Sequence, residues 1–192
     1  LREIDALGLR NIIVESVQPP ESGRANPAGG RRMRFLLTYG LDSRDLARIG
    51  AALPEATLTR CHQVRQKVFY RSARMDARVL GVPPEFFERI RTEVVAGRLF
   101  GRLNEEAGDA VAVVTEQADA RSGALGSLLG RTIMIGRKSV EVVGIARVPT
   151  TEAGGMVFLP YSTARAMFGT LTVKIETGSQ EFSRNEIGQL IV

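Results

Sequence analysis

The sequence feature that most constrains the fold is residues 156–169, MVFLPYSTARAMFG, where a short apolar segment runs directly into a helical pattern. Met156 to Leu159 has the character of a strand, and Pro160 lacks the N–H that sheet pairing requires. Ser162 is a candidate N-cap because its hydroxyl can accept from the next turn, and Gly169 can close a helix of about two turns. The segment therefore predicts a strand followed at once by a helix, as in a core βα corner.

Length and composition allow a substantial core. The chain has 192 residues and 44% hydrophobic content, enough for one domain or two small lobes. Its longest uninterrupted apolar run, Ala110 to Val114, is far shorter than the roughly 20 residues of a membrane helix. Because it starts at Leu1 without a signal-peptide pattern, we expect an excised piece of a longer protein. The single cysteine, Cys61, excludes an internal disulfide and leaves the redox compartment undecided.

The net charge of +5 is concentrated between residues 60 and 78. Alternation with period two places Val64, Val68 and Tyr70 on one face of a strand, with cations on the other. A turn near residues 71–73 would return the chain, so the pattern predicts a hairpin with one wet face. The cations proposed for partner contact are Arg65, Lys67, Arg71, Arg74 and Arg78. They form either a solvated strand face or a surface for an anionic partner or headgroup.

Other local patterns predict further short elements. Leu46, Ile49 and Leu53 share one face of a helix at 43–53, with Asp42 as its N-cap. Pro83 and Pro84 open a short helix carrying Phe86 and Phe87. Ala110 to Val114 predicts a buried strand, and Thr115 can cap a helix at 116–122. The remaining expected elements are strands at 11–17 and 171–175, a loop at 18–32, a hairpin of 132–135 with 139–145, and a helix from about Gln180.

No residue pattern indicates catalysis. Cys61 and His62 are adjacent, so on a strand their side chains point to opposite faces and cannot form a nucleophile–base pair. His62 is the only histidine, which argues against a His-rich zinc site. No Gly-x-Ser-x-Gly elbow and no P-loop are present, and the paired acids Glu105 and Glu106 are expected in a solvated loop. We therefore expect no enzymatic activity, cofactor or metal in this chain.

Several segments together resemble the extracytoplasmic core domain of MacB-type, FtsX-like ABC-transporter permeases. VFLPYSTARAMFG is similar to a strand-to-helix segment near the end of that domain. The pattern of Gly81, Val82, Phe86 and Phe87 followed by Gly-Arg-x-Phe at 97–100 is a second match. Two more are the LG-x-x-N-I-x-V arrangement at 7–14 and the order of segments from 112 to 148. The similarity covers nearly the whole chain.

The resemblance implies an α+β fold with two lobes. A membrane-proximal lobe of βαβ-like halves would comprise 1–65 and 157–192, and a β-rich lobe with short helices, 66–156, would be inserted into it. Both chain ends should emerge at one pole, with a helix end at residues 4–8 rising from a membrane, and the strands at 11–17 and 171–175 should share a sheet.

The resemblance also implies a function. Such domains lie on the periplasmic side of the inner membrane and couple cytoplasmic ATP hydrolysis to export or extraction of a substrate. The implied partners are a second permease copy, an ATPase domain or subunit, and a periplasmic adaptor or substrate protein, without nucleic acid. A basic module that binds anions or nucleic acid is the alternative.

Overall fold

The computed structural model describes residues 13–15, 43–124, 126–149, 155–169, 171–176, 179–184 and 189–191. The chain divides into two compact units. Unit 1 comprises Leu1–Asn11 and Cys61–Phe168, and unit 2 comprises Ile12–Arg60 and Gly169–Val192. The predicted α+β class is confirmed. The lobe limits predicted from the sequence differ from the limits of these two units, because unit 1 groups residues 157–168 with the central segment. The predicted lobe limits stay a prediction.

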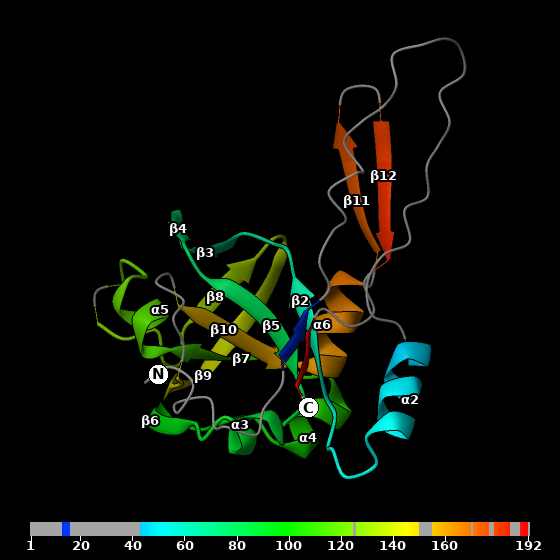
Figure 1. Cartoon of the computed structure of the whole chain (residues 1–192). Coiled ribbons are helices and arrows are strands. Elements are labelled where there is room, and N and C mark those ends of the chain that lie inside the picture. Colours follow the sequence, from blue (N-terminus) through cyan, green and yellow to red (C-terminus); the bar gives the residue numbers. More distant parts are fainter. Residues whose placement is uncertain are drawn as a thin grey trace. The chain divides into compact units, whose positions relative to one another are not determined.

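Unit 1 is built on a curved mixed sheet (Figure 1). Its strands lie in the order β2 (Thr59–Val64, in this unit from Cys61), β5 (Arg78–Val82), β10 (Met156–Pro160), β7 (Val111–Thr115), β9 (Lys138–Arg147), β8 (Thr132–Ile135), β3 (Val68–Tyr70) and β4 (Ala73–Met75). Strand β6 (Glu93–Gly97) pairs with the second half of β9. Its helices are α3 (Phe86–Arg89), α4 (Arg102–Ala107), α5 (Glu116–Ala120) and α6 (Tyr161–Phe168).

The predicted strand-to-helix corner at residues 156–169 is confirmed and lies inside this sheet. Strand β10 is buried along its whole length, parallel to β5 and antiparallel to β7. Pairing reaches Pro160, which is in register with Val82, because a proline at the strand end loses only one donor. The expectation that pairing stops before Pro160 was therefore wrong by one residue. Helix α6 follows directly and packs over β5, where Gly81 leaves room for Ala164.

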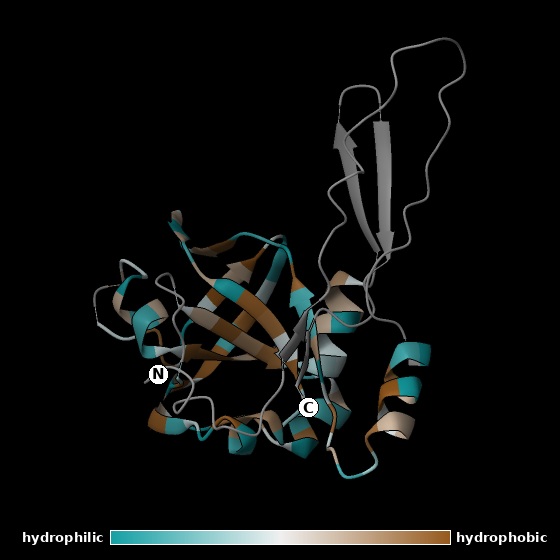
Figure 2. Cartoon of the chain, viewed as in Figure 1, coloured by the Kyte–Doolittle hydropathy of each residue, from teal (hydrophilic) through white to brown (hydrophobic). Residues whose placement is uncertain are grey.

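Apolar side chains from both faces of the sheet form the core. Figure 2 shows that the inner strands, including β5, β7, β9 and β10, are largely hydrophobic. One end is closed by four aromatic rings with centroids 4.9–5.9 Å apart, from α3, the segment after β6, and β10. These rings are Phe86, Phe87, Phe100 and Phe158. The short aromatic helix predicted after Pro83 and Pro84 is thereby confirmed as part of the core.

Both predicted hairpins are present, but the first is shorter than expected. Strands β3 and β4 pair around a turn at residues 71–72, and β8 pairs with β9 around residues 136–137. However, β2 pairs with β5, and β3 pairs with β8. The segment from 59 to 82 therefore splits between two parts of the sheet, because its strands find partners beyond the local hairpin.

Unit 2 contains helix α2 (Ser43–Ala52) and two antiparallel strand pairs. Strand β1 (Ile13–Glu15) pairs with β13 (Gln189–Ile191), and β11 (Leu171–Glu176) pairs with β12 (Ser179–Arg184). The sheet expected between 11–17 and 171–175 was therefore wrong, as was the helix from Gln180, where the chain forms β12. The predicted helix end at 4–8, the loop at 18–32 and the cap at Asp42 lie outside the described residues. In the described segments, no helix has the length and apolarity needed to cross a membrane.

Candidate functional site

Four of the five cations predicted for partner contact are exposed on unit 1. Arg65 and Lys67 lie in the connection from β2 to β3, Arg71 lies in the β3–β4 turn, and Arg74 lies in β4. Arg78, the first residue of β5, is half-buried. The alternation of apolar and polar residues correctly predicted that Val64, Val68 and Tyr70 are buried. The cations, however, belong to several short elements instead of one long strand.

The β3–β4 turn places two arginines around one tyrosine. Arg71 adopts a positive φ of 54°, and its guanidinium carbon lies 5.5 Å from the centre of the Tyr70 ring. Arg131, just before β8, lies 5.8 Å from the same ring centre, and its Nη1 donates to the Tyr70 hydroxyl at 2.6 Å. Both guanidinium groups thus lie within cation–π distance of the ring, and Arg131 is also hydrogen-bonded to its hydroxyl. Sequence reasoning missed Arg131, because it is separated from Tyr70 by 61 positions.

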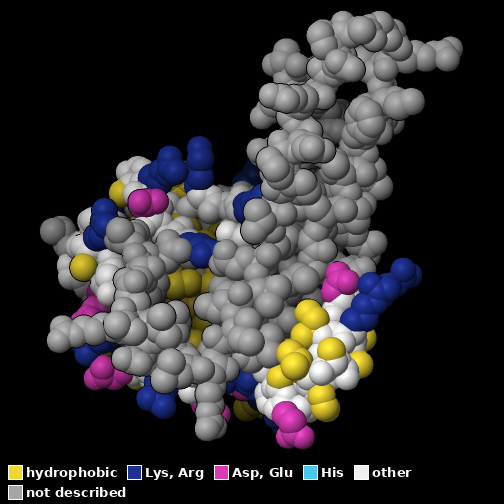
Figure 3. All heavy atoms as spheres, in the orientation of Figure 1, with side chains coloured by type: hydrophobic (Ala, Val, Ile, Leu, Met, Phe, Trp, Pro, Cys, Tyr) yellow, Lys and Arg dark blue, Asp and Glu magenta, His cyan; other side chains and the backbone are white. Residues whose placement is uncertain are grey.

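A second basic turn meets the β2–β3 connection. The backbone N–H of Gly136 donates to the carbonyl of Lys67 at 2.8 Å, which joins the β8–β9 turn to residues 65–67. The next two residues, Arg137 and Lys138, are exposed. Figure 3 shows Lys and Arg side chains gathered over the β3–β4 end of unit 1. The hairpin itself was predicted from the sequence, but its position beside Lys67 depends on the β3–β8 pairing.

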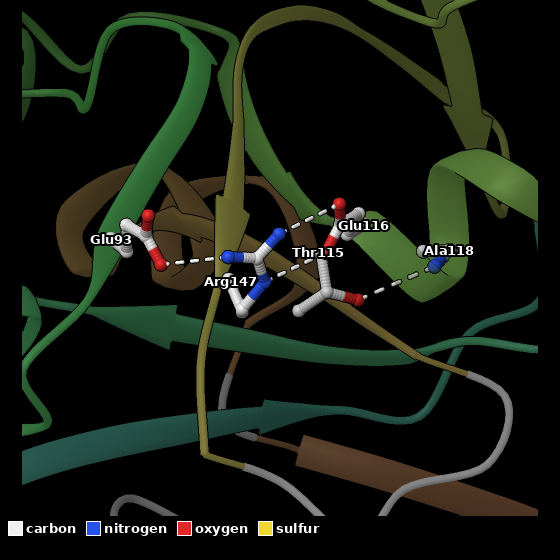
Figure 4. Close-up of polar contacts among 5 residues, drawn as sticks. All are labelled: Glu93, Thr115, Glu116, Ala118 and Arg147. Atoms are coloured by element: carbon white, nitrogen blue, oxygen red, sulfur yellow. Dashed lines mark hydrogen bonds and ion pairs between the residues drawn. The ribbon is translucent and has the colours of Figure 1, made fainter.

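Arg147, near the end of β9, forms ion pairs with two carboxylates, those of Glu93 and Glu116 (Figure 4). Its Nη1 donates to Glu93 at 2.8 Å, while its Nε and Nη2 donate to Glu116 at 3.0 and 3.1 Å. The hydrogen bond from Arg147 lowers the pKa of Glu116. Beside it, Thr115 Oγ1 accepts from the Ala118 N–H at 3.4 Å, which confirms the predicted cap of α5 (Figure 4). The ion pairs of Arg147 with Glu93 and Glu116 link β9 to β6 and to α5, so the role of Arg147 is structural.

Glu105 and Ser162 have roles other than those predicted. Glu105 lies in α4, and its Oε1 accepts from the Ser162 N–H at 2.8 Å. The Ser162 hydroxyl donates to the Glu105 carbonyl at 2.6 Å, so it does not accept from the first turn of α6 as an N-cap would. The carboxylate supplies that acceptor from another helix, and its negative charge suits a helix N-terminus. Glu105 therefore joins α4 to α6 and does not lie in a loop.

The cysteine and histidine considered for catalysis are both buried in β2. Burial raises the pKa of the Cys61 thiol to about 12, and the nearby charge of Arg78 opposes this only in part. A thiol that keeps its proton is a poor nucleophile. In the part of the chain that the structure describes, no three His, Cys, Asp or Glu residues are grouped closely enough to hold a metal ion.

The fold is that of an α+β domain, a mixed sheet with short connecting helices. The family model of the MacB-like periplasmic core domain matches residues 3–187, so the chain belongs to this family. This confirms the resemblance stated from the sequence.

Individual relatives agree with this assignment. The macrolide export ATP-binding/permease protein MacB of Pasteurella multocida is 25% identical over 111 residues, which cover 53% of this chain and 17% of that protein. The periplasmic region of MacB from Actinobacillus actinomycetemcomitans has a TM-score of 0.61 at 17% identity, covering 100% of this chain and 78% of that one. The extracellular domain of the noncanonic ABC-type transporter YknZ, from Gram-positive bacteria, has a TM-score of 0.60 at 15% identity, covering 94% and 83%. These two structures show the fold.

Proposed function

We propose that this domain is the extracytoplasmic part of an ABC-transporter permease in the inner membrane. It couples cytoplasmic ATP hydrolysis to the export or extraction of a substrate on the outer side of that membrane. Membership of the MacB-like periplasmic core domain family supports this, as does the relative described as a macrolide export ATP-binding/permease protein. The chain spans only 17% of that relative's length. In this proposal, ATP hydrolysis takes place in another part of the transporter or in a separate subunit.

The structural observation that carries the proposal is the pairing of β1 with β13. Ile13 is in register with Ile191, and Glu15 with Gln189, so segments near the two ends of the chain lie side by side. Paired strands are about 4.7–4.9 Å apart, and packed helices are about 8–10 Å apart. This pairing therefore suits a domain that leaves one membrane surface and returns to it between two transmembrane helices.

The proposed partners follow from membership of the family and from the relative described as an ATP-binding/permease protein. A second permease copy would form the dimer, an ATPase domain or subunit would drive it, and a periplasmic adaptor or substrate protein would contact the exposed surface of the domain. The candidate contact residues remain Arg65, Lys67, Arg71, Arg74 and Arg78. A basic module that binds anions or nucleic acid is the second candidate function, and the exposed cations of unit 1 are the observation that favours it.

The test is whether nucleotide moves this domain in the full-length permease. Replacing exposed Glu106 with Cys gives a site for a spin label on each copy of a dimer reconstituted in nanodiscs. We expect the distance distribution between the two labels to differ between the ATP-bound state, held by a non-hydrolysable analogue, and the nucleotide-free state. Within this domain the native thiol will not compete for the label, because Cys61 is buried and its pKa is about 12; cysteines elsewhere in the permease are first replaced by Ser.

The matched control is the unsubstituted protein, which should give no dipolar signal. A second label site, on exposed Glu88 of α3, should report the same nucleotide dependence. If the distributions at both sites are identical with and without nucleotide while ATP is hydrolysed, the coupling role is wrong.

A further inference from the structure

The β2–β3 connection and the β8–β9 turn of unit 1 meet to form a compact basic surface, which we call the basic turn pair. Its members are residues 65–67, with the sequence Arg-Gln-Lys, and residues 136–138, with the sequence Gly-Arg-Lys. The hydrogen bond of 2.8 Å from the Gly136 N–H to the Lys67 carbonyl joins them. Their cations are Arg65, Lys67, Arg137 and Lys138, all exposed.

Sheet geometry holds the two turns together. Val68 pairs with Ile135, which in turn pairs with Lys138, so Lys67 and Lys138 stand at the same end of three neighbouring strands. With strands about 4.7–4.9 Å apart, their backbones lie within about 10 Å of each other. Gly136 has a φ of 59°, and a Cβ there would lie 2.8 Å from Gln66 Oε1. The Gln66 side chain thus packs against the Gly136 backbone, and the backbone hydrogen bond from Gly136 to Lys67 holds the two segments together.

The cations of the basic turn pair are not neutralised by other described residues. Ion pairs of described residues include Arg48 with Asp45, and Arg147 with Glu93 and Glu116. None involves a residue of the basic turn pair. One carboxylate, that of exposed Asp76, lies at the same end of these strands, because Asp76 follows Met75 and Met75 pairs with Val68; it forms no ion pair with the four cations. Like charges held this close repel one another, and an anionic partner would relieve that repulsion. Two of the four are arginines, whose planar guanidinium can bind a carboxylate through two parallel hydrogen bonds.

The residues around the basic turn pair favour an acidic protein as its partner over nucleic acid or a membrane surface. Single-stranded nucleic acid is bound by cations interleaved with exposed aromatic rings, but neither turn carries an aromatic residue. Of the two rings in the adjoining strand β3, Tyr70 is only 7% exposed and Phe69 is half-buried, so neither offers an open face on which bases could stack. Binding in a membrane interface requires large apolar side chains beside the cations. Neither turn has one, since the exposed large apolar residues in the described chain are Leu53, Val94, Val95, Leu103 and Leu129.

We propose that the basic turn pair is a docking surface for an acidic segment of a partner protein, bound through its carboxylates. The proposal rests on the proposed function in one respect, namely that the partner is met outside the membrane. It does not depend on coupling of this domain to ATP hydrolysis. Arg137 and Lys138 thereby join Arg65 and Lys67 as contact residues, whereas half-buried Arg78 does not belong to this surface.

The experiment measures binding of a fluorescein-labelled decaglutamate peptide to the full-length permease in neutral detergent, by fluorescence anisotropy. The test variant replaces Arg65, Lys67, Arg137 and Lys138 with Ser. A matched control replaces four dispersed exposed arginines with Ser, at Arg48, Arg91, Arg102 and Arg165, and so removes the same charge. We expect Kd to rise about tenfold in the test variant and less than about threefold in the control.

Three results would overturn the proposal. Equal loss of peptide binding in both variants would show an effect of net charge only. Tighter binding of a single-stranded oligonucleotide of equal charge, lost in the test variant, would identify a nucleic-acid surface. Co-sedimentation with phosphatidylglycerol vesicles that is lost in the test variant, without peptide binding, would identify a lipid surface. Because the spin-label measurement has a separate readout, a failure here is distinguishable from a failure of the transporter assignment.

Discussion

Cys61 shows how burial sets the chemistry of a single side chain in this domain. Its side chain is 0% exposed, and its pKa is raised to about 12 from an ordinary value of 9.0. Since the folded state holds the proton more tightly, the stability that this thiol contributes is complete below about pH 9 and is lost as the pH rises toward about 12. The sequence placed Cys61 on a strand but could not show that both faces of that strand are covered.

Native Cys61 should therefore resist alkylation. At pH 8 we expect iodoacetamide to modify it at least about a hundredfold more slowly in the folded chain than in urea, because the thiolate is the reactive form. A Ser72→Cys variant, with its new thiol in the exposed β3–β4 turn, is the positive control. Mass spectrometry of quenched samples measures both rates. Equal rates at the two positions in the folded protein would contradict the burial seen here.

At the scale of elements, local sequence patterns predicted individual helices and strands well, but they did not predict which strands pair with one another. The β10–α6 corner, the aromatic α3, the cap of α5 and the β8–β9 hairpin each depend on a few neighbouring residues, and each was predicted. Pairings such as β3 with β8 join residues more than 60 positions apart, and no local signal specifies them. For the same reason Arg65 and Lys67 were predicted as candidate contacts, while Arg131, Arg137 and Lys138 were missed.

The α4–α6 contact is another such long-range feature and can be tested. In Glu105→Ala the Ser162 N–H loses its carboxylate acceptor, while the bond from the Ser162 hydroxyl to the backbone of residue 105 can persist. We expect the free energy of unfolding to fall by about 1–2 kcal/mol, as for loss of a helix cap or a buried hydrogen bond. Urea denaturation followed by circular dichroism measures the change.

Glu106→Ala is the matched control for this contact. Glu106 is the next residue of α4 and is exposed, so its removal should change the free energy of unfolding by less than about 0.5 kcal/mol. Equal effects of the two substitutions would mean that the Glu105 carboxylate does not stabilise α6.

For the molecule as a whole, the functional assignment depends on where the chain ends lie. The sequence resemblance predicted that both chain ends emerge at one pole, and this stays a prediction, since the pairing of β1 with β13 concerns only residues 13–15 and 189–191. It also predicted that the strand near residue 171 would be the partner of β1. That strand instead forms the β11–β12 hairpin, because the residues from 179 continue as an antiparallel strand and supply its pairing locally. Strands that are close together in the sequence pair with little loss of loop entropy, which favours β12 over a distant strand as the partner of β11.

A disulfide between β1 and β13 tests this arrangement in the membrane. Val14 is in register with Leu190, and directly opposed residues of antiparallel strands have Cα atoms about 4.5–5.5 Å apart, within the range that a disulfide spans. In the full-length permease, Val14→Cys with Leu190→Cys should form an intramolecular disulfide under mild oxidation, seen as one cross-linked peptide pair by mass spectrometry. The control, Val14→Cys with Thr172→Cys, should not, because Thr172 pairs with Ser183. Cross-linking in the control pair alone, or only between two copies of the chain, would show that the ends do not meet as β1 and β13, and the insertion between two transmembrane helices would lose its structural support.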